Sequence, residues 1–385
     1  MALKKNALLP FLSFIFAFFI GGIIIVVSDP VIMGQLSSPG KFLTSAASRI
    51  GNSYLAIFQG SIYDVNLARE SGFFRGFYPM SETIVTAVPL LFAGLAVALA
   101  FRSGLFNIGA QGQFIFGAIG ASYVGFAYEL PPLIHVPLVL IAGIVLGGLF
   151  GGFVGLLKAK TGAHEVIVTI MLNYVAAYFL LWLLSTTAFL RPGRQDPLAP
   201  DVRESAQLPH LFGEDLRANL GFIIALIAAG AIWWLLNRST WGFRFRAVGA
   251  NADASRTAGI SVARVTTSVM FIAGALAGLG GAMQILGSEP AMTAGIGGSF
   301  GFDAITVALL ARANPIGTVF AALLFGALRA GGLTMQASTE TPLDLVLVIQ
   351  ALVVLFIAAP ALVKALFRLK NVETGEAVAS KGWNG

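Results

Sequence analysis

Long apolar runs separated by short polar stretches dominate the pattern of this chain. A helix needs about 20 mostly apolar residues to cross a bilayer, and ten segments approach that length. We therefore predict an all-α, polytopic membrane protein of about ten transmembrane helices. The predicted spans are Leu8–Ser28, Thr83–Phe101, Leu105–Tyr128, Pro137–Leu157, Glu165–Thr187, Leu220–Leu236, Val265–Leu286, Met292–Ala311, Ile316–Met335 and Leu343–Ala359.

The eighth predicted span has the weakest pattern because it opens with the glycine-rich stretch 293–299. Glycine destabilises a helix interior. Irregular backbone at membrane depth is tolerated only where it is buried in protein or lines a water-filled cavity. We therefore expect this segment to lie inside the bundle, away from lipid.

The composition supports a single membrane-embedded bundle. Hydrophobic residues make up 57% of the chain and charged residues 11%, whereas soluble domains carry about 25% charged residues. There is no cysteine, which excludes disulfides and thiolate chemistry. The three histidines are scattered without ligand spacing, so the sequence predicts no metal site.

The distribution of basic residues predicts the topology. With ten spans and both termini in the cytoplasm, nearly all lysines and arginines of the short loops fall on the inner side, as the positive-inside rule requires. The predicted transmembrane domain then covers residues 1–370 and is followed by a cytoplasmic tail, 371–385. Longer connecting segments lie outside at 30–80 and 188–219, and inside at 237–265.

The outer segment 30–80 contains an amphipathic pattern. Apolar residues recur at helical spacing, with Arg49 and Asn52 on other faces; they are Leu43, Ala47, Ile50, Tyr54 and Ile57. We predict an interfacial helix along the outer surface. The segment 188–219 is rich in proline and charge and is predicted to be an exposed cap. Either segment could receive a partner, or both could be solvated loops on the bundle rim.

The inner segment 237–265 carries the signature of a short helix. Asn251 suits an N-cap, Asp253 lies in the first turn, Arg256 follows, and Gly259 suits a left-handed C-terminal position. Ala254 and its neighbouring alanines are small enough to enter a groove on another protein. The alternative is an ordinary basic loop.

Several polar side chains fall within or beside the predicted spans. Asn107, Gln111 and Gln113 begin the third span, and Asp303 lies in the eighth. A second set, spaced four residues apart on one helical face, comprises Glu165, Thr169 and Asn173. Buried polar groups need partners, which a polar solute or interhelical hydrogen bonds can supply, and an ionisable residue inside a span suggests function. Gly147, Gly151 and Gly155 predict a helix-packing face.

A faint internal similarity relates spans 2–5 to spans 7–10. The stretch AGLAVALA from Ala93 resembles AGALAGLG from Ala273, and each precedes a glycine-rich, interrupted segment. One span separates the two sets, so they run in opposite directions. This arrangement predicts an inverted repeat with the solute route near the interrupted helices.

Motifs of enzymatic chemistry are absent. The chain lacks G-x-x-x-x-G-K-[ST], G-x-S-x-G and H-E-x-x-H. The sequence therefore predicts no enzyme and no nucleotide site of its own. It leaves transport, conduction or scaffolding as roles.

Four stretches resemble the bacterial ABC importer permeases for nucleosides and simple sugars. They are RSGLFNIGAQGQ from Arg102, HEVIVTIMLNYV from His164, WGFRFRAVGAN from Trp241 and GFDAITVALLARANP from Gly301. The likeness spans about residues 80–365 in the same order. Gln111 departs from it, because glutamate is expected there in most relatives. The loss of that charge would alter a local pairing.

The resemblance implies a type II ABC importer fold and several partners. These are an ATPase with tandem nucleotide-binding domains that binds ATP-Mg, a second permease subunit in a hetero- or homodimer, and an external binding protein or lipoprotein. It makes Ala252–Gly259 the coupling helix. The predicted ATPase-coupling residues are Arg244, Arg246, Asn251, Ala254, Arg256 and Gly259, and the predicted pathway residues are Asn107, Gln111, Gln113, Asn173 and Asp303.

The resulting hypothesis is an importer subunit for nucleosides, with simple sugars as the alternative solutes, in the bacterial inner membrane. The chain itself is expected to bind no cofactor. An ion-coupled secondary transporter is the competing class. Proton coupling usually requires a carboxylate deep in the membrane, for which Asp303 and Asp344 are the candidates.

Overall fold

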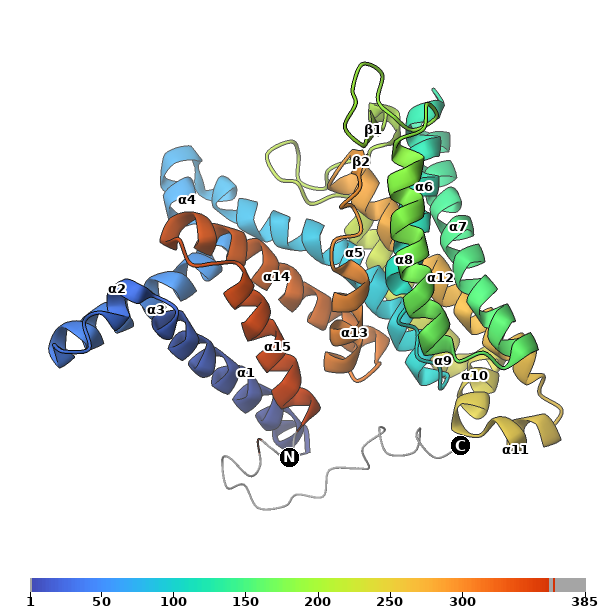
Figure 1. Ribbon diagram of the computed structural model, residues 1–385, viewed down its shortest axis with the longest axis horizontal. Coiled ribbons are helices and arrows are strands. Elements are labelled where there is room, and N and C mark those ends of the chain that lie inside the picture. Colours follow the sequence, from blue (N-terminus) through green and yellow to red (C-terminus); the bar gives the residue numbers. More distant parts are fainter. Residues whose placement is uncertain (1, 360–362, 364–385) are drawn as a thin grey trace. The chain divides into compact units, whose positions relative to one another are not determined.

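The computed structural model describes residues 2–359 and 363, which are helical through most of their length (Figure 1). They form two compact units. Unit 1 contains the described residues of 1–60 and 331–385, and unit 2 contains Ser61–Ala330. The predicted tail, 371–385, lies outside the described residues.

Unit 1 is built from the two ends of the chain. Its elements are α1 (Ala2–Val27), α2 (Pro30–Met33), α3 (Pro39–Ser61), the last residues of α14 (Pro315–Thr339) and α15 (Asp344–Ala358). Apolar side chains of α1 and α15 pack together around Ala17 and Val353, both fully buried. The rings of Phe16 and Phe356 meet edge to face, with centroids 4.9 Å apart.

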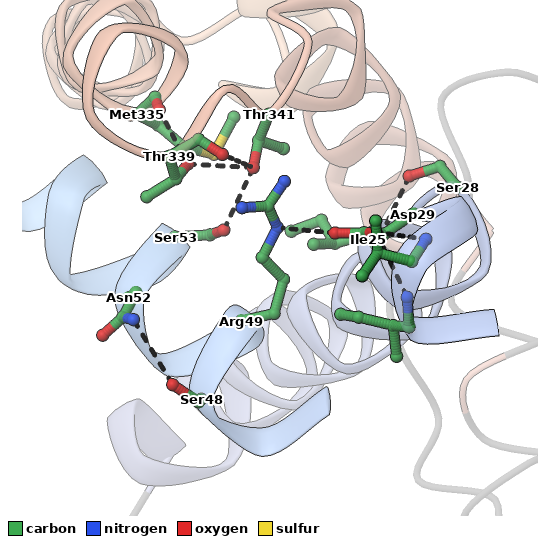
Figure 2. A network of polar contacts seen from close by, with 12 residues as sticks. Ile25, Ser28, Asp29, Ser48, Arg49, Asn52, Ser53, Met335, Thr339 and Thr341 are labelled. Atoms are coloured by element: carbon green, nitrogen blue, oxygen red, sulfur yellow. Dashed lines mark hydrogen bonds and ion pairs between the residues drawn. The ribbon is translucent and has the colours of Figure 1, made fainter. Parts of the chain in front are cut away.

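A partly buried ion pair fixes α3 within unit 1 (Figure 2). Arg49 Nε lies 3.2 Å from Asp29 Oδ2, and Asp29 also caps α2 by accepting from the amides of Val31 and Ile32. The helix predicted in this segment is present as α3. On its predicted apolar face, Leu43 is 65% exposed, whereas Ile57 is buried within the described residues.

Unit 2 contains the remaining elements. They are α4 (Val65–Ser71), η1 (Phe73–Phe77), α5 (Tyr78–Arg102), α6 (Ala110–Ala127), α7 (Pro132–Thr161), α8 (Glu165–Leu184), β1 (Leu198–Asp201), η2 (Glu204–Ala206), α9 (Gly221–Arg238), α10 (Thr240–Ala250), α11 (Ala252–Thr257), α12 (Val262–Gly287), β2 (Ala291–Thr293), α13 (Phe300–Leu310) and the first part of α14.

The core of unit 2 is α5, which is apolar on every face. All residues from Leu90 to Ala100 are buried, and a helix that is hydrophobic all round must be enclosed by others. It packs against α12 and α13, while α12 also packs against α6 and α7. The outer helices α7, α8 and α9 instead leave large apolar side chains exposed on one face, such as Ile167 and Ile227. Such faces suit lipid.

Glycine allows α7 and α12 to approach backbone to backbone. A Cβ on Gly147 would lie 2.5 Å from the carbonyl oxygen of Gly274, and a Cβ on Gly151 would lie 2.3 Å from that of Met270. A Cβ on Gly155 would lie 2.8 Å from the Cα of Thr267. The packing face predicted from the glycine spacing on α7 is therefore confirmed.

Six helices of the described residues are long and apolar enough to cross a membrane. They lie in Phe73–Arg102, Pro132–Thr161, Glu165–Leu184, Gly221–Arg238, Val262–Gly287 and Pro315–Thr339. Within the described residues, α1, α13 and α15 contribute shorter apolar segments. Helix α6 begins with the polar residues Gln111 and Gln113, and the predicted span around it starts too early, because residues 105–109 are not helical.

The eighth predicted span is wrong in its first half. Residues Ala291–Thr293 form β2, which pairs antiparallel with β1, and α13 begins only at Phe300. The intervening turn uses glycine, with Gly298 at a φ of +43°. A strand partner from the loop 188–219, together with these glycines, replaces the helix predicted from Met292.

The two long connections of unit 2 lie at opposite ends of it. Figure 1 shows β1 and β2 at one end, and α10 and α11 at the other. The connection between α9 and α12 contains two helices, whereas the sequence predicted only one. The additional helix, α10, begins at Ser239, whose hydroxyl accepts a hydrogen bond from the amide of Gly242.

Candidate functional site

The predicted pathway residue Asn107 lies in the turn between α5 and α6, where it is fully buried with Gln113. Their amide groups form a reciprocal pair. Asn107 Nδ2 donates to Gln113 Oε1 at 2.9 Å, and Gln113 Nε2 donates to Asn107 Oδ1 at 3.1 Å. The amide of Gly109 also donates to Asn107 Oδ1. The pair therefore fixes the turn onto the first turn of α6.

Asn173 joins α8 to the same region. Its Oδ1 accepts from the amide of Gly112 at 2.9 Å, and its Nδ2 donates to the carbonyl of Ile108 at 2.9 Å. Thr169 is fully buried and donates to the carbonyl of Glu165. The four-residue spacing thus places these α8 side chains on one buried face. The hydrogen bonds of Asn173 and Thr169 described above join them to backbone groups and not to another predicted pathway side chain.

Glu165 forms an ion pair that the sequence did not predict. Its carboxylate is 8% exposed and lies 2.5 Å from the Nζ of Lys158, at the end of α7. The left-handed Gly162 ends α7 between them, so α8 turns back and brings the two charges together.

Gln111 connects α6 to the glycine-rich turn before α13. Its Nε2 donates to the carbonyl of Gly298 at 3.0 Å, and its Oε1 accepts from the amide of Gly301 at 2.7 Å. A Cβ on Gly301 would lie 2.3 Å from the backbone of Gln111, so only glycine permits this approach. A glutamate would lack the donor to Gly298.

Asp303, the remaining predicted pathway residue, lies in the first turn of α13. Its Oδ2 accepts from the hydroxyl of Ser299 at 2.6 Å. The nearest cation is Arg329 on α14, with its Nη1 3.8 Å away. Sequence reasoning missed Arg329, although a lone arginine in the apolar stretch 319–333 was a usable signal.

The short helix predicted in this segment is present as α11, and its coupling role stays a prediction. Asn251 caps it by accepting from the amide of Ala254 at 2.9 Å, and Asp253 pairs with Arg256 at 2.8 Å. Gly259 has a φ of +80°, as predicted for the left-handed position. Ala254 and Arg256 are exposed. The segment is therefore a short, self-contained helix with an accessible surface.

The two arginines of α10 differ in their surroundings. Arg244 is exposed and stacks over the ring of Trp241, with the guanidinium carbon 5.7 Å from the ring centroid. Arg246 is half-buried. Its Nη1 is buried and, within the part of the chain that the structure describes, has no hydrogen-bond partner.

A glycine contact joins α10 to the α5–α6 turn. A Cβ on Gly249 would lie 2.5 Å from the carbonyl carbon of Ser103, and a Cβ on Gly104 would lie 2.7 Å from the Cα of Gly249. The backbones therefore touch directly. Asn107 belongs to the same turn, so the polar network begins three residues beyond this contact.

The sequence predicted no metal site. Among the residues that the structure describes, no group of three or more histidines and carboxylates is arranged to hold a metal ion.

Comparison with known proteins identifies relatives over most of the chain. A guanosine ABC transporter permease protein of Bacillus subtilis, NupP, is 43% identical over 75% of this chain and 83% of its own length. A nucleoside ABC transporter permease protein of Lactococcus lactis, NupB, is 34% identical over 79% of this chain and 85% of its own. A glucose ABC transporter permease protein of Haloferax volcanii, TsgB13, is 34% identical over 73% of this chain and 76% of its own length. No solved structure matches the chain.

The family comparison agrees with the helical architecture. The model of the branched-chain amino acid transport system permease component matches residues 80–358. This range contains all but the first two residues of α5 and every element from α6 to α15, including the polar network between α5, α6 and α8. The matched range covers most of the chain, and the chain is a polytopic membrane protein that belongs to the family of branched-chain amino acid transport system permease components.

Proposed function

We propose that this chain is the permease subunit of an ATP-binding cassette importer for nucleosides. The observation that carries the proposal is the 43% identity to a guanosine permease over three quarters of the chain, supported by the nucleoside permease at 34%. Simple sugars are the alternative solutes, because a glucose permease is equally 34% identical. Both solute classes are uncharged and carry several hydroxyl groups.

The proposed architecture has ten spans, with α5–α8 and α12–α15 as an inverted repeat and both termini in the cytoplasm. The short helix α13 and the late start of α6 would be the interrupted helices beside the solute route. The position of α10–α11 and of β1–β2 at opposite ends of unit 2 supports an inner and an outer end.

The proposed complex contains partners that supply energy and solute. An ATPase with tandem nucleotide-binding domains would bind ATP-Mg and dock beneath α10 and α11. A second permease subunit would complete the route, and an external binding protein or lipoprotein would deliver the solute. The exposed Arg244 and Arg256 would meet the ATPase.

The proposed coupling runs through direct contacts. Motion of α11 would move α10, whose Gly249 presses on the backbone of Ser103 and Gly104. The turn would transmit this motion to Gln113 through its pairing with Asn107. Because close-packed elements shift between discrete arrangements, this chain of contacts would switch the bundle between outward-open and inward-open states.

Reconstituted uptake tests the proposal. The purified permease pair and the ATPase are reconstituted in proteoliposomes, and the binding protein is added. Uptake of radiolabelled guanosine is then measured with and without ATP on the side of the membrane where the ATPase lies. We expect uptake to require ATP hydrolysis and to persist when an uncoupler dissipates the proton gradient. Uptake that persists without ATP and stops with the uncoupler would instead support the ion-coupled transporter.

A substitution tests the placement of the coupling helix. Ala254→Arg puts a long cation on the exposed face of α11, and we expect the ATPase to be lost on purification. Ala47→Arg is the matched control, because Ala47 is an exposed helical alanine of the predicted outer segment. If both variants retain the ATPase equally, α11 is not its docking element.

A further inference from the structure

An ion pair inside the apolar bundle of unit 2 has a geometry that leaves it incomplete. Arg329 lies in α14 and Asp303 in α13, both in stretches otherwise dominated by apolar residues. A charged side chain within a membrane segment is costly to maintain and is usually paired or functional. Here the two side chains remain 34% and 22% exposed, respectively. A solute could therefore reach the exposed parts of both side chains, but not the Nη1 of Arg329, which is buried.

The pair is too widely spaced for a direct hydrogen bond. Arg329 Nη1 lies 3.8 Å from Asp303 Oδ2, beyond hydrogen-bond distance. This Nη1 is buried and has no hydrogen-bond partner among the described residues. Asp303 is held by Ser299 at 2.6 Å. The arrangement therefore places a fixed acceptor beside a partly exposed guanidinium that does not hydrogen-bond to it.

Aromatic packing holds the guanidinium in this position. Its central carbon lies 4.6 Å from the ring centroid of Phe300, a favourable cation–π distance. The Phe300 ring is only 5% exposed and stacks on Phe114 of α6, with centroids 5.2 Å apart. Arg329 is thus stacked on a rigid support, and its separation from Asp303 does not result from a freely moving side chain.

The chemistry of the pair selects a hydroxyl group. A hydroxyl both donates and accepts hydrogen bonds, so one placed beside the pair can donate to Asp303 and accept from Arg329. The charges of the carboxylate and the guanidinium cancel, so the pair gives no net attraction to an anionic or a cationic ligand. We propose that Asp303 and Arg329 form a recognition site for a hydroxyl of an uncharged nucleoside or sugar during its passage.

The site is connected to the coupling route. Gln111 holds Gly298 and Gly301 on either side of Ser299 and Phe300, so movement of α6 changes the position of the Asp303 carboxylate relative to Arg329. The inference rests on the proposed function, because it assigns the solute's hydroxyl to a place on the same route. It adds Arg329 and a chemical reason for selecting hydroxylated, uncharged solutes.

The test compares two solutes within each preparation. Proteoliposomes with the full complex are assayed for ATP-dependent uptake of guanosine and of 2′,3′-dideoxyguanosine, which lacks the ribose diol. In Asp303→Asn and Arg329→Gln we expect the rate ratio of guanosine to the dideoxy analogue to fall by about tenfold from the wild-type ratio, because a hydrogen bond to a charged group is lost. Arg329→Lys should retain part of the preference.

The rate ratio separates recognition from stability, since it does not depend on the amount of assembled protein. The matched control is Arg217→Gln, which breaks a comparable pair with Glu82 at 3.1 Å and should leave the ratio unchanged. Unchanged ratios in Asp303→Asn and Arg329→Gln would overturn the site. An unchanged ratio with equal losses of uptake for both solutes would show that the two residues have only a structural role.

A second measurement uses the wild-type complex alone. Photoactivated 8-azidoguanosine should label the peptide containing Asp303 or the one containing Arg329, and guanosine should displace it better than the dideoxy analogue. Labelling confined to other peptides would refute the site. A different result would contradict the proposed function itself: a wild-type complex that shows no ATP-dependent uptake of guanosine or glucose. If glucose alone is carried, the rate comparison is made with 2-deoxyglucose.

Discussion

The crossing of α7 and α12 makes a sharp prediction about Gly278. A Cβ on Gly278 would lie 2.3 Å from the carbonyl oxygen of Gly143 and 2.9 Å from the Cα of Gly147. Ordinary van der Waals contact begins at 3.4 Å, so Gly278→Ala creates an overlap of about 1.1 Å with backbone. Neither atom belongs to a flexible side chain, and the helices must move apart.

The magnitude follows from comparing two similar substitutions. Overpacking a tight interface by one methyl group costs about 1–3 kcal/mol, because separation by about 1 Å forfeits up to half of each dispersion contact. Replacing glycine by alanine in a helix also contributes about 1 kcal/mol of stabilisation. Gly230→Ala on α9 isolates that second effect, since a Cβ there meets nothing within 4 Å. We expect Gly278→Ala to be less stable than Gly230→Ala by about 1–3 kcal/mol.

The assay is unfolding of the purified subunit in detergent micelles, followed by helical circular dichroism against increasing denaturant. Gly278→Ala should unfold at a lower denaturant concentration than wild type, or at most the same, while Gly230→Ala should unfold at the same or a higher concentration. If Gly278→Ala is as stable as Gly230→Ala, the helices do not cross through this glycine, and the packing described for unit 2 is refuted.

Three further substitutions test the polar contacts. Gln111→Leu leaves the buried amide of Gly301 unpaired, at about 1–3 kcal/mol, and also removes the donor to the carbonyl of the exposed Gly298, so it should lower stability in the same unfolding assay. Asn251→Ala removes the cap of α11, worth about 0.5–2 kcal/mol, and should reduce solute-stimulated ATPase activity, whereas Thr257→Ala should not. Lys158→Met leaves the Glu165 carboxylate unpaired and should destabilise the subunit, with recovery on adding Glu165→Gln. Stability equal to wild type in Lys158→Met would exclude a contribution from this pair.

Local signals predicted the short helix α11 well. The N-cap at Asn251 and the left-handed Gly259 are properties of a few consecutive residues, and both are present in the structure. The glycine spacing on α7 similarly predicted a packing face, because close helix contacts require a missing Cβ. What the sequence did not reveal was the partner of that face, which is α12.

Most of the polar residues that the sequence singles out are buried in the structure, but the sequence did not predict their pairings. Asn107 and Gln113 are near in sequence, whereas Gln111 bonds a turn 187 residues away. Arg329 was passed over because its nearest carboxylate lies on another helix. Pairings of this kind depend on how helices cross, and hydrophobic periodicity within one helix carries no information about that.

The sequence by itself determined that this chain is a helical membrane protein, since hydropathy is a property of each run of about 20 consecutive residues, charge placement of each loop, and capping of one or two helical turns. The tertiary structure decided where α13 begins, because β2 takes Ala291–Thr293 into a pair with β1. It also decided which face of α3 is buried, through the pairing of Arg49 with Asp29. The physical reason is the same in both cases: hydrogen bonds and ion pairs between distant segments outweigh the weak local preferences of glycine-rich or mildly amphipathic stretches.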